Sequence, residues 1–138
     1  MKRWMVIVLV MIALALGAGA QVFADSGSDK VKAANERAAQ DYLKSGLLLA
    51  GEGQDTEAVK SFRQALGMRP DWAEVHSLLG SALARIGNYS EAEAELRKAV
   101  ALKPDYAEGW NFLGEFLKQR GKEQEAQEAF RKAQQYAR

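Results

Sequence analysis

Residues 73–106 read AEVHSLLGSALARIGNYSEAEAELRKAVALKPDY, and this stretch decides the fold because it is one unit of a repeat. When the sequence is shifted by thirty-four residues, small residues fall on small residues from Gly46 onward. A fixed period of this length is typical of proteins built from stacked units, each of which buries its apolar face against its neighbours. The residues that recur are Gly46, Gly80 and Gly114; Gly53, Gly87 and Gly121; Ala58, Ala92 and Ala126; and Ala65, Ala99 and Ala133.

Each unit has the pattern of two helices with a turn between them, and no strand pattern appears. The first set of glycines stands where paired helices must approach closely. The second set, at 53, 87 and 121, stands at the ends of first helices, where the chain needs a residue at positive φ. Asp71 with Glu74, and Asp105 with Glu108, have the spacing of a capping box. We expect helices over Lys30–Gly51, Thr56–Gly67, Ala73–Ile86, Ser90–Leu102, Ala107–Arg120 and Gln124–Ala137.

The recurring residues resemble the signature of the tetratricopeptide repeat family, whose unit is a pair of antiparallel helices. The unit at the end of the chain matches best, and the first unit is weakest because Ser45 stands where a leucine is expected. The resemblance implies an all-α solenoid of three antiparallel helix pairs, with repeats at 39–72, 73–106 and 107–138. The matching residues of the last unit are Trp110, Leu113, Gly114, Leu117, Gly121, Ala126, Phe130 and Ala133.

Residues 1–24 form a separate segment. Lys2 and Arg3 precede an apolar run that begins at Trp4, and small residues lead to Ala24. This order is typical of a secretory signal peptide. Residues 4–24 are also long enough to be an uncleaved membrane anchor, an apolar helix ahead of the repeats. Both interpretations predict an exported protein, either free in the periplasm or anchored to the inner membrane with its repeats on the periplasmic side. Residues 25–38 are predicted to be a linker, Asp25–Asp29, and the start of a long first helix.

Composition argues against several functions. The chain has no cysteine and one histidine, His76, which is expected to pack between paired helices. Removing Lys2 and Arg3 from the 19 basic residues leaves 17, against 18 acidic residues. A nearly neutral domain without a basic run gives no indication of nucleic-acid binding. No phosphate loop, nucleophile motif or metal-ligand pattern is present, so we expect no enzyme activity, no cofactor and no metal.

The resemblance also implies a concave groove, lined by the first helices of the units, that binds a peptide or protein partner. Arg85, Asn111 and Lys118 could hydrogen-bond an extended peptide, and Leu43 with Leu47 could form an apolar floor. The alternative is that these side chains are merely exposed and bind nothing specific. The groove residues are Leu43, Leu47, Glu74, Ser77, Ser81, Arg85, Glu108, Asn111, Glu115 and Lys118.

Two aromatic residues of the last unit, Phe112 and Phe116, add a candidate docking edge because they stand four apart on one helix. One branch of the family grips the C-terminal carboxylate of chaperone tails with Lys, Asn and Arg. Those residue types are absent from the matching positions here, and Glu108 would repel a carboxylate. That ligand is therefore not expected. The matching positions hold Leu43, Leu47, Leu78, Glu108 and Phe112.

Two functions remain from the sequence. The first is a non-catalytic, exported adaptor or scaffold that binds its partner through the concave face of the repeats. The second is a single-pass structural subunit of a membrane complex, of respiratory or photosynthetic type, anchored by residues 4–24. Self-association through the end of the last unit is compatible with either, because no additional capping helix follows it.

Overall fold

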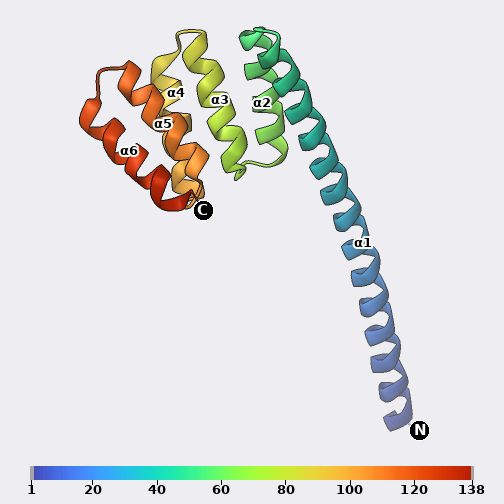
Figure 1. Ribbon diagram of the computed structural model, residues 1–138. Helices are drawn as coiled ribbons and strands as arrows, with labels where there is room; N and C mark the ends of the chain where they lie inside the picture. Colours follow the sequence, from blue (N-terminus) through green and yellow to red (C-terminus); the bar gives the residue numbers. More distant parts are fainter. Residues whose placement is uncertain (1, 138) are drawn as a thin grey trace. The chain divides into compact units, whose positions relative to one another are not determined.

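The computed structural model describes residues 2–137, and the side chains of residues 27–137. The described residues form six helices and no strand (Figure 1). The chain divides into two compact parts, Met1–Asn35 and Glu36–Arg138, and the second part contains the repeat units. The helices are α1 (Lys2–Gly51), α2 (Asp55–Met68), α3 (Ala73–Arg85), α4 (Tyr89–Leu102), α5 (Ala107–Gln119) and α6 (Glu123–Tyr136).

The interpretation of residues 1–24 as a signal peptide or anchor lies outside the residues whose side chains are described. Within residues 27–137, no helix combines the length and the apolar character that crossing a membrane requires. Helix α1 includes residues 25–29, where the sequence predicts a linker. Gly27 and Ser28 are poor helix formers, but each costs only about 1 kcal/mol or less inside a helix that continues on both sides.

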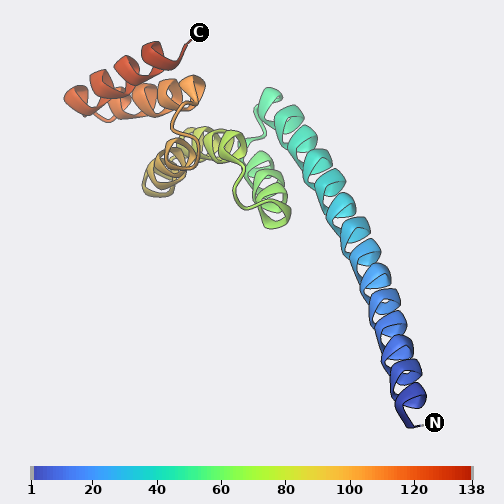
Figure 2. The ribbon, with the colours of Figure 1, turned by 90° about the horizontal axis from the view of Figure 1, so that it is seen from below.

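Within residues 36–138 the helices pair as predicted. α3 packs against α4 and α5 against α6, each pair joined by a short turn, and α3 also contacts α2 and α5 (Figure 2). The bounds of α2 to α6 lie within one residue of those expected from the sequence. The all-α solenoid of helix pairs is therefore confirmed.

The glycines at 46, 80 and 114 show how closely the two helices of each pair approach. A Cβ atom added to Gly80 would lie 2.7 Å from Cγ of Leu96, and one added to Gly114 would lie 2.7 Å from the ring of Phe130. A Cβ on Gly46 would lie 2.5 Å from the ring of Phe62. The second helix of each pair thus packs a large apolar side chain against the glycine of the first helix. This packing confirms that these glycines stand where paired helices approach closely.

The turns between paired helices confirm the second set of glycines. Gly53, Gly87 and Gly121 have φ angles of 78°, 84° and 74°. These values lie in the left-handed region, which glycine enters without the steric cost that a Cβ imposes. Each turn therefore depends on glycine for its backbone conformation.

The predicted capping boxes are wrong. The N-cap residue of α3 is Trp72, and its carbonyl accepts the first helical hydrogen bond from the His76 amide at 3.1 Å. Asp71 therefore lies one residue too early to cap the helix, and no side chain forms the cap hydrogen bond. The side chain of Trp72 is buried, and Cζ of Arg69 lies 4.3 Å from the centre of its ring. The packing of this ring therefore determines where α3 begins.

Ser45, the mismatch of the first unit, has a structural reason. Its equivalents Leu79 and Leu113 are each only 2% exposed, because α3 and α5 each have a preceding unit to cover them. Ser45 is exposed, and its hydroxyl lies 3.4 Å from that of Ser61. Terminal units of stacked repeats carry polar residues on the uncovered face, and Ser45 provides one.

The outer faces of the second helices carry ion pairs that follow the repeat, which we call the ladder. Arg63 of α2 lies 2.6 Å from Glu91 of α4, and Arg97 of α4 lies 2.5 Å from Glu125 of α6. Both members of the second pair stand thirty-four residues after those of the first. Exposed pairs contribute little stability singly, but these two join successive units in one register.

Candidate functional site

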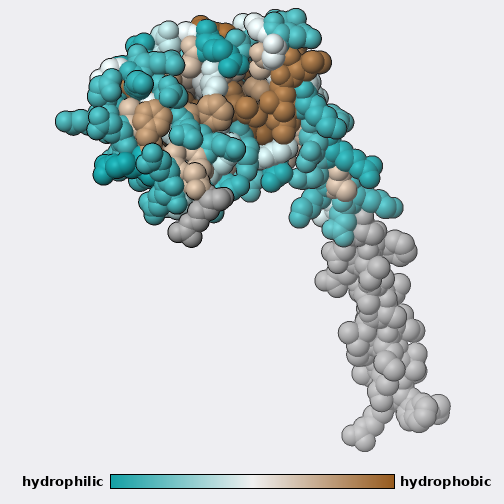
Figure 3. Space-filling model, viewed as in Figure 1, coloured by the Kyte–Doolittle hydropathy of each residue, from teal (hydrophilic) through white to brown (hydrophobic). Residues whose placement is uncertain are grey.

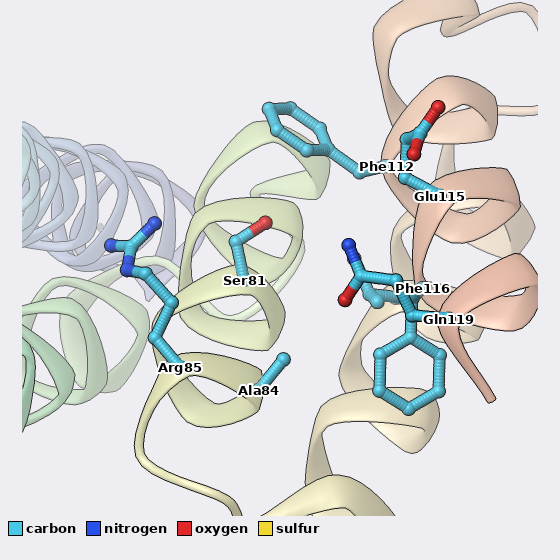
Figure 4. Close-up of a pocket in the computed structure, with 8 residues that line it drawn as sticks. Ser81, Ala84, Arg85, Phe112, Glu115, Phe116 and Gln119 are labelled. Carbon is cyan, nitrogen blue, oxygen red and sulfur yellow. The ribbon is translucent and has the colours of Figure 1, made fainter.

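A pocket of about 320 Å³ opens between α3 and α5. Figure 4 shows side chains of the two helices facing one another across it. Leu96 and Phe116 are buried and, with Ala84, form its apolar base. The remaining lining residues are Ser81, Arg85, Phe112, Glu115 and Gln119.

Helical spacing explains why these residues meet. Ser81, Ala84 and Arg85 stand three and four apart, so they share one face of α3. Phe112, together with Glu115, Phe116 and Gln119, does the same on α5. Because α3 and α5 are first helices of successive units and contact one another, the two faces meet. Repeat stacking thus builds the pocket from two distant stretches of sequence.

Arg85 is held in place by a residue of another unit. Its Nη2 atom lies 2.6 Å from Oδ1 of Asp55, and its Nε donates a hydrogen bond of 2.7 Å to the same oxygen. Asp55 is 15% exposed at its side chain and Arg85 is 50% exposed. Figure 4 shows the Arg85 side chain directed away from α5, and its guanidinium is held by the carboxylate of Asp55 on α2, which compensates its charge.

The structure brings together only part of the predicted groove. The three predicted residues that line the pocket are Ser81, Arg85 and Glu115. Those that lie half-buried or exposed outside it are Leu43, Leu47, Glu74, Glu108, Asn111 and Lys118. Glu74 accepts a hydrogen bond of 2.8 Å from Nζ of Lys103, which ties it to the end of α4.

Ser77 does not face the groove, although the sequence predicts that it does. Its exposed fraction is 0%, and its hydroxyl has no hydrogen-bond partner among the described residues. Its equivalent Leu43 is half-buried and Asn111 is exposed. The difference arises because α3 is the central first helix and is covered on both sides, by α2 and by α5.

We expect Ser77→Ala to stabilise the protein by about 1 kcal/mol. The substitution removes a buried hydroxyl without a partner and adds a better helix former. Urea unfolding followed by circular dichroism measures the change, with Ser81→Ala as the control because Ser81 is only half-buried at the same helix. A destabilised Ser77→Ala variant would show that the hydroxyl has a partner after all.

His76 forms the most enclosed polar contact of the repeats. Its Nε2 donates a hydrogen bond of 2.8 Å to the carbonyl oxygen of Pro70, and its Nδ1 lies 2.5 Å from Oε2 of Glu95. In the next unit, Nε1 of Trp110 donates a bond of 2.8 Å to the carbonyl of Pro104. His76 is 3% exposed, so its predicted packing between paired helices is confirmed.

The carboxyl group of Glu95 is affected by this contact. Its hydrogen bond to His76 lowers its pKa below the ordinary value of 4.5, while partial burial acts in the opposite direction. His76 and Glu95 bridge α3 and α4 and do not line the pocket between α3 and α5. Within residues 27–137, no group of three or more His, Cys, Asp or Glu side chains is placed to hold a metal ion. The contact joins α3 to α4 and to the carbonyl of Pro70.

Several apolar side chains of the repeats are exposed. Leu47 is 47% exposed, Leu48 is 64% exposed and Phe112 is 38% exposed. Figure 3 shows hydrophobic residues gathered over the end of α1 and the neighbouring helices, with hydrophilic residues around them. An apolar surface bordered by polar residues is typical of a protein interaction site.

Comparison with known proteins identifies the repeat. The sequence pattern of the tetratricopeptide repeat matches residues 43–107 and again residues 78–138. No curated protein matches the chain. The TPR domain of Arabidopsis OM64 superposes with a TM-score of 0.71 at 18% identity, over 75% of this chain and 85% of that one.

Two further solved structures are similar. The second TPR of Spaghetti (RPAP3), bound to the HSP90 peptide SRMEEVD, has a TM-score of 0.71 at 20% identity, over 78% of this chain and 98% of that one. MamA has a TM-score of 0.66 at 20% identity, over 72% of this chain. The alignment covers 58% of MamA, so this chain spans little more than half of that protein. At such identities the likeness concerns the fold alone.

Proposed function

Because the chain belongs to the tetratricopeptide repeat family, we propose that it is a protein–protein interaction module that binds a peptide segment of its partner between α3 and α5. The observation that carries this proposal is the pocket of about 320 Å³ between the two first helices. Its volume lies at the small end of ligand pockets, at about 300 Å³ and above. Such a space has room for a large side chain of a peptide.

The composition of the pocket suits an extended peptide. Phe116 and Leu96 offer an apolar base, and Ser81 and Gln119 offer hydrogen-bonding groups at the wall. These residues stand on packed helices, and Arg85 is already held by its ion pair. A preformed site loses little conformational freedom on binding, so more of the contact energy appears as affinity.

The similar structures support peptide binding as the general mode. The second TPR of Spaghetti (RPAP3) holds a peptide, and its fold superposes on this one. The clamp that grips chaperone tails is not reproduced here, since its positions hold leucine, phenylalanine and Glu108. We therefore propose a peptide ligand of another chemical class.

Phe112→Ala is expected to weaken peptide binding about fivefold or more. Its ring borders the pocket and is 38% exposed, and aromatic anchors commonly contribute more than about 1 kcal/mol to binding. Peptides selected from a random display library against the immobilised full chain provide the ligand, and fluorescence anisotropy with synthetic copies measures affinity.

The matched control is Tyr136→Ala. Tyr136 has nearly the same exposure, 36%, but lies at the end of α6 and does not line the pocket. The selected peptides should bind this variant with unchanged affinity. If both variants bind like the wild type, the ligand lies elsewhere and the proposed groove is wrong.

We also propose that the protein is exported, on the basis of the order of basic, apolar and small residues in residues 1–24. Intact mass of the native protein in soluble and membrane fractions tests this proposal. A soluble species beginning near Asp25 supports a free periplasmic adaptor. A full-length species in the membrane fraction would instead support the single-pass subunit of a membrane complex.

A further inference from the structure

The charges at the pocket are unequal, and this inequality points to the chemistry of the ligand. The two charged residues that line the pocket are Arg85 and Glu115. Asp55 lies 2.6 Å from the Arg85 guanidinium and compensates its charge. Glu115 is exposed and has no ion-pair partner within 4.0 Å among residues 27–137. The uncompensated charge at the pocket is therefore negative.

Helix α5 places an aromatic ring between two such carboxylates. Glu108, Phe112 and Glu115 stand four and three residues apart, so they share one face of α5, and all three are exposed. Like Glu115, Glu108 has no ion-pair partner among the described residues. Carboxylates accept hydrogen bonds from a cationic side chain, and the face of an aromatic ring attracts the same cation.

Neighbouring charges do not cancel this negative surface. Lys118 stands one turn beyond Glu115, but it neither lines the pocket nor lies within ion-pair distance of that carboxylate. On α3, Glu74 is paired with Lys103 at 2.8 Å. The wall opposite α5 therefore adds no free cation that would attract an acidic ligand.

We propose that the groove binds a peptide in which an arginine or lysine stands next to a large apolar side chain. The apolar side chain enters the pocket above Ala84, Leu96 and Phe116, and the cation lies between Phe112 and Glu115. This inference rests on the proposed function and names the class of its ligand. SRMEEVD, the peptide bound by Spaghetti (RPAP3), also has an arginine next to a methionine, but it carries three acidic residues. Glu108 and Glu115 of this chain would repel those acidic residues, so we expect a ligand without them.

The test uses three synthetic peptides with the same apolar residues and either arginine, glutamine or glutamate at one flanking position. Fluorescence anisotropy with the full chain should show the arginine peptide binding about tenfold more tightly than the glutamate peptide, with a smaller difference at high salt. Glu115→Gln should weaken the arginine peptide about fivefold, and Glu115→Lys should reverse the order of the two charged peptides.

The matched control is Glu128→Lys, which makes the same charge change on α6, at an exposed position that does not line this pocket. It should leave the order of the peptides unchanged. If the glutamate peptide binds best, or if Glu115→Lys keeps the original order, the basic ligand is wrong, while loss of binding in Phe112→Ala would still support the groove. If no peptide from the set or from the display library binds, the proposed function fails and this inference fails with it.

Discussion

Gly80→Leu is expected to separate α3 from α4 and to destabilise the repeats by more than about 3 kcal/mol. Even a Cβ atom at this position would lie 2.7 Å from Cγ of Leu96 and 3.1 Å from the backbone oxygen of Ala92. The backbone oxygen cannot rotate away as a side chain can, so the two helices must move apart. Because α3 also contacts α2 and α5, its displacement reaches both neighbouring units. Thermal unfolding followed by circular dichroism measures the loss.

Gly67→Leu provides the control for this substitution. Gly67 also lies in a helix, α2, but a Cβ atom there would have no neighbour within 4 Å. Leucine favours the helix more than glycine does, so this variant should be as stable as the wild type or slightly more stable. An unchanged melting curve for Gly80→Leu would contradict the close packing of α3 on α4.

His76→Leu is expected to cost about 2–4 kcal/mol. The substitution leaves the carbonyl of Pro70 and the carboxylate of Glu95 without their partner in a largely buried place. Chemical denaturation measures the cost. Glu95→Gln, which keeps a hydrogen-bonding side chain beside the ring, should cost less. Equal stability of His76→Leu and the wild type would contradict this account.

The third unit suggests a pair of variants that tests the hydrogen bond from the ring to the Pro70 carbonyl. Trp110 occupies the place of His76, and Ala129 the place of Glu95. The double variant His76→Trp/Glu95→Ala reproduces that arrangement and keeps a ring N–H for the Pro70 carbonyl. His76→Phe/Glu95→Ala lacks this donor and also has a smaller ring, so it should be at least about 1 kcal/mol less stable than the tryptophan variant.

The same contact gives stability a pH dependence. The pKa of Glu95 is lower in the folded protein than its ordinary value of 4.5, because His76 hydrogen-bonds its carboxylate. The unfolded chain therefore binds a proton at higher pH than the folded chain does. The contribution is present above pH 4.5 and is lost as the pH falls through the folded pKa. The fall in melting temperature on acidification should be smaller in Glu95→Gln.

Much of the fold follows from residues whose role is local or strictly periodic. The turn at Gly87 requires a positive φ, and the packing at Gly80 leaves no room for a Cβ atom. Both requirements select glycine, so they are visible in the sequence as glycines that recur with the repeat. The capping box at Asp71 failed for a local reason of another kind. The buried ring of Trp72 determines where α3 begins, and this packing has no signature in the spacing of polar residues.

The site was harder to predict because it depends on contacts between units. The pairing of Arg85 with Asp55 joins residues thirty apart, and without it the pocket would have a free positive charge. Ser77 was misplaced because the same position is half-buried or exposed in the outer units, as Leu43 and Asn111 show. Leu96 belongs to a second helix, whereas groove residues were sought on first helices. The position of a residue within the repeat predicts which face of the helix its side chain occupies. How deeply that side chain is buried depends on which units lie on either side.

The ladder of Arg63–Glu91 and Arg97–Glu125 repeats the same ion pair at both junctions between units. Each pair joins the second helices of two successive units at the same phase, so a unit carries an arginine for its successor and a glutamate for its predecessor. A duplicate of residues 73–106, inserted after Tyr106, would bring both charges in register and would find both partners in place. Copying this single stretch of the gene would therefore lengthen the stack and its groove while keeping the same ion pair at every junction between units.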